Sequence, residues 1–117
     1  MSDEHTLKRT LIKVYFLQND KVKAWIMEVC TRTGKLFSAW QAMGFTHGVI
    51  NTDNMSLIGL TIDYGPFAFL EKFDPSFTPN TTDSSRRYCY GNQPHIGLWN
   101  CERFVRVYLA FIADLNW

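Results

Sequence analysis

The chain has 117 residues, a formal charge of +1 at neutral pH, 46% hydrophobic residues and 15% aromatic residues. This length allows one small domain, the interspersed charges give no basic stripe for nucleic acid, and no apolar run approaches the roughly 20 residues of a membrane span. The aromatic content is high for so small an interior, so we expect a partner for exposed apolar surface, but neither nucleic acid nor a membrane span.

The first 19 residues are ambiguous, because residues 11–17 fit either a strand or the approach to a helix. From Lys21 onward, apolar residues recur at spacings of three and four, which predicts an amphipathic helix of about 20 residues. Gly44 follows the last of them, as glycine often does just beyond a helix. We expect the apolar stripe of this helix to pack in the core: Val22, Trp25, Ile26, Val29, Leu36, Phe37 and Trp40.

Residues 45–54 have the composition of a loop. Two short β-prone runs, 55–58 and 60–62, flank Gly59 and predict a tight hairpin. Residues 67–73 predict a helical turn, and the polar stretch 74–94 a long ordered loop. Residues 96–115 predict a second helix with one apolar side.

Three cysteines, Cys30, Cys89 and Cys101, are an odd number without Cys-x-x-Cys spacing. They predict neither a zinc site nor a disulfide framework, and a reducing intracellular compartment is the simpler interpretation. The amino terminus has acidic residues before a short apolar stretch, so no secretory signal or transit peptide is visible.

The most informative segment runs from His47 to Asn54 and is followed by Asp63-Tyr64-Gly65. Protein kinases have a catalytic loop, His-Arg-Asp-Leu-x-x-x-Asn, and then a metal-binding Asp-Phe-Gly. His47 and Asn54 have the separation of the first and last residues of that loop. Val49, however, stands where kinases have the catalytic aspartate. Valine cannot accept a proton, so Asp53 is the nearest replacement.

These residue types fit phosphoryl-type chemistry. Mg²⁺ bridging a triphosphate is held by hard oxygen ligands, one from an asparagine of the loop and one from an aspartate after a strand. Asn54 and Asp63 supply both types, Asp53 could accept a proton or add charge to the metal site, and we assign His47 to packing beneath the loop. The alternative is that the polar cluster is ordinary turn chemistry, and the residues alone leave both interpretations open.

Several longer stretches resemble the selenoprotein O family of protein adenylyltransferases. The resemblance is nearly continuous over about residues 20–102 and rests on residues 40–56, 59–66, 73–75, 79–83, 86–88 and 92–100. It implies a kinase-like fold that binds ATP and transfers AMP to Ser, Thr or Tyr hydroxyls of other proteins. By the same resemblance Asp53 is the proton acceptor, Asn54 and Asp63 are Mg²⁺ ligands, and Asp63 also contacts ATP.

We therefore expect an α+β fragment of the large lobe of a protein-kinase-like fold: long helix, catalytic loop, β-hairpin, long loop and C-terminal helix. Residues 1–19 form an unmatched segment, 20–102 a partial adenylyltransferase domain, and 103–117 a helical tail. The family's Gly-rich loop and nucleotide-binding Lys and Arg residues are not found before residue 20. The alternative function is thus an inactive fragment without the nucleotide-binding small lobe, and ordinary phosphotransfer is a third. The resemblance implies an intracellular protein, in a mitochondrion or plastid if the source is eukaryotic.

Arg86 and Arg87 lie in the predicted long loop. Their guanidinium groups suit phosphate or carboxylate. The preferred interpretation is that they are solvated or pair with Asp74 and Asp83.

Overall fold

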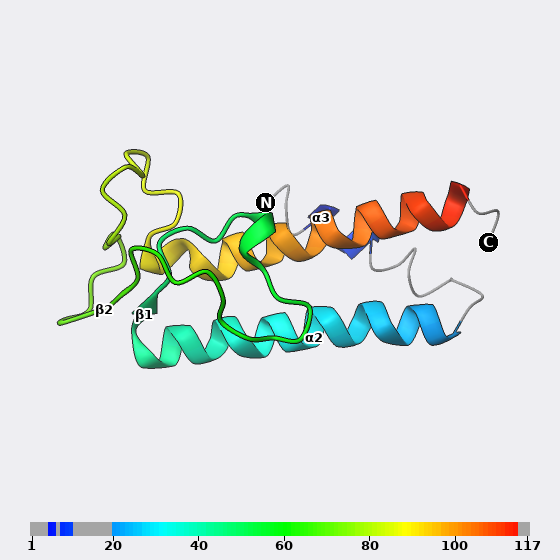
Figure 1. The fold of residues 1–117 in the computed structure, drawn as a ribbon, viewed down its shortest axis with the longest axis horizontal. Coiled ribbons are helices and arrows are strands. Elements are labelled where there is room, and N and C mark those ends of the chain that lie inside the picture. Colours follow the sequence, from blue (N-terminus) through cyan, green and yellow to red (C-terminus); the bar gives the residue numbers. More distant parts are fainter. Residues whose placement is uncertain (1–4, 7, 11–19, 115–117) are drawn as a thin grey trace.

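Two long helices, α2 (Asp20–Met43) and α3 (Gln93–Asp114), lie side by side and antiparallel in the computed structural model of the chain (Figure 1). The structure describes residues 5, 6, 8–10 and 20–114, so the ambiguous stretch 11–17 lies outside the described residues. Between α2 and α3 the chain forms two short strands, β1 (Phe45–Thr46) and β2 (Ala68–Phe69), and two 3-10 turns, η1 (Thr52–Asn54) and η2 (Tyr90–Asn92). This mixture of helices and one small sheet is compatible with the expected α+β class.

The predicted long helix is confirmed by α2. Its buried residues recur every three or four positions, so that one face of the helix is turned to the interior: Ile26, Val29, Thr33, Phe37 and Trp40. Gly44 follows with a φ of +72°, in the left-handed region that glycine adopts at little cost. The chain therefore leaves α2 where the sequence indicates and enters β1 directly.

The interior has two parts. One contains Phe37, Trp40, Phe45, Ile50 and Ile96, so it joins α2, β1, the following loop and α3. The other contains Ile26 and Val105, surrounded by partly buried side chains farther along both helices. The first part lies beneath the segment that carries the predicted site residues.

The predicted hairpin over residues 55–62 is wrong. This stretch is irregular, and the antiparallel pair is formed instead by β1 and β2, with Phe45 opposite Phe69 and Thr46 opposite Ala68. The turn at Gly59 packs on α2, because a Cβ there would lie 3.0 Å from Cβ of Arg32 and 3.1 Å from its carbonyl oxygen. Contact with a helix distant in sequence thus replaces local strand pairing.

The predicted helical turn at 67–73 is also wrong, because β2 occupies Ala68–Phe69. The long loop is confirmed, but it gives way to η2 at Tyr90. Helix α3 then begins at Gln93, three residues before its expected start, and extends to Asp114.

A band of large apolar side chains is exposed on the segment between η1 and the long loop. The expected partner for exposed apolar surface stays a prediction that this band supports. Its members are Leu57, Ile58, Leu60, Tyr64, Phe67, Phe69 and Phe73. Among the described residues, no helix combines the length and the apolar character that crossing a membrane requires.

Candidate active site

A buried glutamine of α3 holds the start of the loop that carries the predicted site. Gln93, the first residue of α3, is completely buried, and its Oε1 accepts a hydrogen bond from the backbone N–H of His47 (3.0 Å). Its Nε2 donates to the carbonyl of Phe45 (2.8 Å) and to Oε1 of Gln41 (2.7 Å). One side chain therefore fixes the end of α2, strand β1 and the start of the loop against α3.

His47 connects this loop to the segment that leads to Asp63. The ring is completely buried, its Nδ1 accepts from the backbone N–H of Val49 (3.3 Å), and its Nε2 lies 2.7 Å from the carbonyl oxygen of Ile62. Since Nδ1 is the acceptor, Nε2 has the proton and donates to Ile62. The assignment of His47 to packing is confirmed, and the hydrogen bond adds the positioning of Ile62.

Trp40 supports the same segment from α2. Its indole Nε1 donates to Oγ1 of Thr61 (3.0 Å), and its ring stacks on that of His47 with centroids 5.6 Å apart. The two residues before Asp63 are thus held by two buried side chains of the core. Position 63 is fixed by the fold although no regular strand precedes it.

Asn54 closes the loop. It ends η1, with its backbone N–H donating to the carbonyl of Asn51 (3.0 Å), and its side-chain Nδ2 donates to the carbonyl of Val49 (2.7 Å). The second amide atom, Oδ1, is the one that a cation would bind. From α3, Nδ2 of Asn100 donates to the carbonyl of Ile50 (2.7 Å), so that side-chain amides hold two successive carbonyls of the loop.

Asp53 and Asp63 are both exposed. Asp63 has a φ of +54°, a conformation in which non-glycine residues are uncommon and aspartate is enriched. Such a backbone state costs of the order of 1–3 kcal/mol and persists where its surroundings impose it, often at functional sites. Here the bonds to Thr61 and Ile62 supply that constraint.

The hydrogen bonds bring two of the predicted segments together. Asn54 is tied to Val49, two residues from His47, and His47 is tied to Ile62, the neighbour of Asp63. Asp53 lies in η1 beside Asn54. That the side chains of Asn54 and Asp63 share one ion stays a prediction. In the described part of the chain, no group of three or more His, Cys, Asp or Glu side chains could hold a metal ion.

The donor set nonetheless fits Mg²⁺. This ion is usually held by one or two protein oxygens, with water and substrate phosphates completing the shell, and thus does not need three acidic or His ligands. The carboxylate of Asp63 and the amide oxygen of Asn54 are hard donors of this kind. These two side chains could therefore supply the protein oxygens that a Mg²⁺ ion needs.

Both arginines of the long loop are exposed, as expected for solvated charges, but their guanidinium groups contact a carbonyl and an aromatic ring rather than Asp74 or Asp83. Arg86 Nη1 donates to the carbonyl of Ser76 (2.6 Å), and the guanidinium of Arg87 lies over the ring of Trp99 with its Cζ 5.0 Å from the centroid. Asp83 accepts from the backbone N–H groups of Arg87 (3.0 Å) and Tyr88 (2.9 Å). Asp83 thus caps the turn by accepting backbone hydrogen bonds, whereas Arg86 binds a carbonyl oxygen and Arg87 packs on an aromatic ring.

Sequence reasoning missed the amide side chains that hold the loop: Gln93, Asn100 and Asn80, whose Nδ2 donates to the carbonyl of Gly48 (3.1 Å). Asn and Gln are common on surfaces, and no pattern in the sequence separates these from exposed ones. Only the position of Gln93 and Asn100 on one face of an amphipathic helix, among apolar residues, could have indicated burial.

Comparison with known proteins gives a consistent result. A sequence model of the family described as "Protein adenylyltransferase SelO" matches residues 3–116, a wider range than the 20–102 of the resemblance. Proteins named "Protein nucleotidyltransferase YdiU" are similar to the chain: 58% identity over 91 residues in Nitrosospira multiformis, 51% over 90 in Methylobacillus flagellatus and 52% over 93 in Salmonella typhi. These alignments cover 77%, 76% and 80% of the chain but 16%, 17% and 19% of the relatives. The chain thus spans less than a fifth of the length of these relatives.

Proposed function

We propose, since this chain belongs to the SelO family of protein adenylyltransferases, that it provides the catalytic loop and the metal ligands for transfer of AMP from ATP to Ser, Thr or Tyr hydroxyls of other proteins. The observation that carries the proposal is the tie between the two parts of the site through His47 and Ile62. The division of the chain at residues 20 and 102, and the placement of the middle part in the large lobe of a kinase-like fold, belong to the same proposal.

Each residue has a distinct role in this reaction. The hydroxyl oxygen of the protein substrate attacks the α-phosphorus of ATP, the bond from that phosphorus to the bridging oxygen breaks, and pyrophosphate leaves. Asp53 accepts the hydroxyl proton, for which its exposed position in η1 beside Asn54 is suitable. Val49 cannot do this, and its backbone groups instead bind His47 and Asn54.

Asn54 and Asp63 orient the phosphates. Bound Mg²⁺ would neutralise phosphate charge as it develops on the leaving group. The amide of Asn54 is held by Val49 in a fixed orientation, and the backbone of Asp63 is held in its left-handed conformation, which limits the reorganisation that binding requires. We assign Asp63 as an ATP contact as well, as the family resemblance implies.

Labelled ATP tests the reaction. With a protein acceptor and Mg²⁺, we expect label from the α-phosphate to be transferred and label from the γ-phosphate not to be. Asp53→Asn should lower transfer by about 10²–10⁴-fold and Asp63→Ala should abolish it, whereas Asp74→Asn, a change in the long loop outside the candidate site, should do neither. Transfer of the γ label would identify ordinary phosphotransfer, and transfer of neither would support the alternative of an inactive polypeptide.

The ligand set has a test that does not need activity. Mn²⁺ accepts the same oxygen ligands as Mg²⁺ and broadens the nuclear magnetic resonance signals of nearby groups. We expect the side-chain amide of Asn54 and the backbone of Asp63 to broaden together. If only one of them broadens, the two residues do not share an ion.

A further inference from the structure

Helices α2 and α3 meet along one face of each, and each of these faces contains one cysteine. At one contact, Gly97 lies against Phe37 so closely that a Cβ on the glycine would be 2.8 Å from the phenyl ring. At another, Ile26 and Val105 are completely buried together. Cys101 lies one helical turn from both Gly97 and Val105, and Cys30 lies one turn from Ile26. The antiparallel register therefore places the two cysteines opposite each other between the two contacts.

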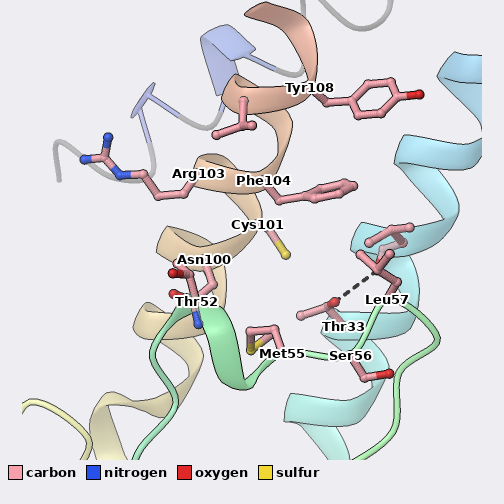
Figure 2. A pocket seen from close by; sticks show the side chains of 12 residues that line it. Thr33, Thr52, Met55, Ser56, Leu57, Asn100, Cys101, Arg103, Phe104 and Tyr108 are labelled. Atoms are coloured by element: carbon pink, nitrogen blue, oxygen red, sulfur yellow. Dashed lines mark hydrogen bonds between the residues drawn. The ribbon is translucent and has the colours of Figure 1, made fainter. Parts of the chain in front are cut away.

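The side chains at these positions are directed into the same space. Cys30 and Cys101 both line a cavity of about 570 Å³ between the helices, and Phe37 and Gly97 line it as well. Figure 2 shows the sulfur of Cys101 turned away from α3 toward α2. Both residues are partly buried, so a small reagent can reach them.

The two thiols also act on each other directly. Interaction with the Cys101 side chain lowers the pKa of the Cys30 thiol, and the Cys30 side chain, with burial, raises the pKa of the Cys101 thiol. One thiolate stabilised by a neighbouring thiol is the arrangement in which thiol–disulfide exchange proceeds readily. Cys89, in the long loop before η2, is not part of this pair.

We propose that Cys30 and Cys101 form a redox-active dithiol that low-molecular-weight disulfides convert into a disulfide joining α2 to α3. The thiolate of Cys30 attacks one sulfur of oxidised glutathione, the glutathione S–S bond breaks, and one glutathione thiolate leaves. Cys101 then loses its proton and attacks the Cys30 sulfur of the mixed disulfide, releasing the second glutathione. In sum, two protein thiols are oxidised and one glutathione disulfide is reduced to two thiols.

The position of the pair gives this bond a structural consequence. Cys101 follows Asn100, whose side chain holds the carbonyl of Ile50 in the candidate site loop. A disulfide at this place would fix α3 to α2 one residue from that hydrogen bond. The chemistry of the pair does not depend on the proposed adenylyl transfer, and neither does its test.

The test is a count of free thiols and a peptide map of the folded protein after equilibration with oxidised glutathione. We expect the three thiols to fall to one, the mass to decrease by two hydrogens, and a non-reducing digest to join the peptides that contain Cys30 and Cys101. Cys89→Ala should form the same bond and retain no free thiol. Cys101→Ala should stop at a mixed disulfide of Cys30 with glutathione.

The proposal is overturned if all three thiols of the folded wild-type protein persist, or if the disulfide involves Cys89 or a second molecule. These outcomes need no substituted protein, so a variant that fails to fold does not obscure them. Circular dichroism before and after oxidation establishes that the bond forms in the folded state.

Discussion

The Nε2–H group of His47 donates a hydrogen bond to the carbonyl of Ile62, 2.7 Å away. This bond ties the start of the candidate site loop to the residue before Asp63. Fifteen residues separate the two partners in sequence. The ring also accepts a hydrogen bond from the backbone N–H of Val49 and stacks on Trp40, and these contacts fix its orientation. The position of Asp63 relative to the loop thus depends on this imidazole, together with the hydrogen bond from Trp40 to Thr61.

Replacement of His47 should therefore affect stability strongly. In His47→Leu, the part-buried carbonyl of Ile62 and the part-buried N–H of Val49 lose their partner, and leaving such a group unsatisfied costs about 1–3 kcal/mol. We expect a loss of about 2–4 kcal/mol in the free energy of unfolding, measured by urea denaturation. In His47→Gln the amide nitrogen can still donate to Ile62, so part of the loss should be recovered. Equal stability of the two variants would show that the bond to Ile62 contributes nothing.

Two substitutions at Asp63 should distinguish the effect of its backbone conformation on stability from its proposed role as a metal ligand. Asparagine tolerates the left-handed conformation as aspartate does, so Asp63→Asn should change the free energy of unfolding by less than about 0.5 kcal/mol. A β-branched residue does not, and Asp63→Val should cost about 1–2 kcal/mol. Asp63→Val should lose the Mn²⁺-dependent broadening at Asn54, and Asp63→Asn, which keeps an oxygen but not the charge, should weaken it. Full broadening in Asp63→Val would remove Asp63 from the ligand set.

The two helices could be predicted from the sequence because their burial pattern is local. The residues that face the interior of α2 repeat at the helical period, and Gly44 marks its end by its own conformational preference. The start of α3 was misplaced by three residues, since Gln93 is polar and its burial depends on partners in α2 and β1.

The segment between Asn54 and Phe73 could not be predicted, because its partners are distant in sequence. Leu57, Ile58 and Leu60 have β-strand preferences but are 50–60% exposed, and the turn at Gly59 is placed by Arg32 of α2. The only strand pair in the described part of the chain joins Phe45 to Phe69, across 24 positions. The candidate site residues stay a prediction from spacing, residue type and the family resemblance, whereas the amides that hold their segments were not predicted.

The space around Gly97 and Gly34 predicts opposite effects on stability when each glycine is replaced by alanine. A Cβ at Gly97 would lie 2.8 Å from the ring of Phe37, so Gly97→Ala should force the helices apart and destabilise the protein by about 1–3 kcal/mol. At Gly34, on an exposed position of α2, a Cβ would meet nothing within 4 Å. Gly34→Ala should therefore stabilise the protein by about 0.5–1 kcal/mol through helix propensity. Thermal unfolding of both variants checks the pair, and a stabilising Gly97→Ala would mean that the helices are not closely packed there.

The thiol pair predicts unequal reactivity of its two members toward iodoacetamide. The neighbouring Cys101 thiol lowers the pKa of Cys30, and the pKa of Cys101 is raised by Cys30 and by burial. Because the thiolate is the reactive form, the alkylation rate of Cys30 should rise at lower pH than that of Cys101. Mass spectrometry of digests from a pH series measures both rates in one sample.

Two controls connect this difference to the fold. In concentrated urea the two cysteines should react with the same pH profile, because the neighbouring thiol and the burial are lost. In folded Cys101→Ala, the Cys30 profile should move to higher pH, since the group that stabilises its thiolate has been removed. An unchanged Cys30 profile in that variant, or faster reaction of Cys101 in the folded protein, would mean that the two sulfurs do not interact.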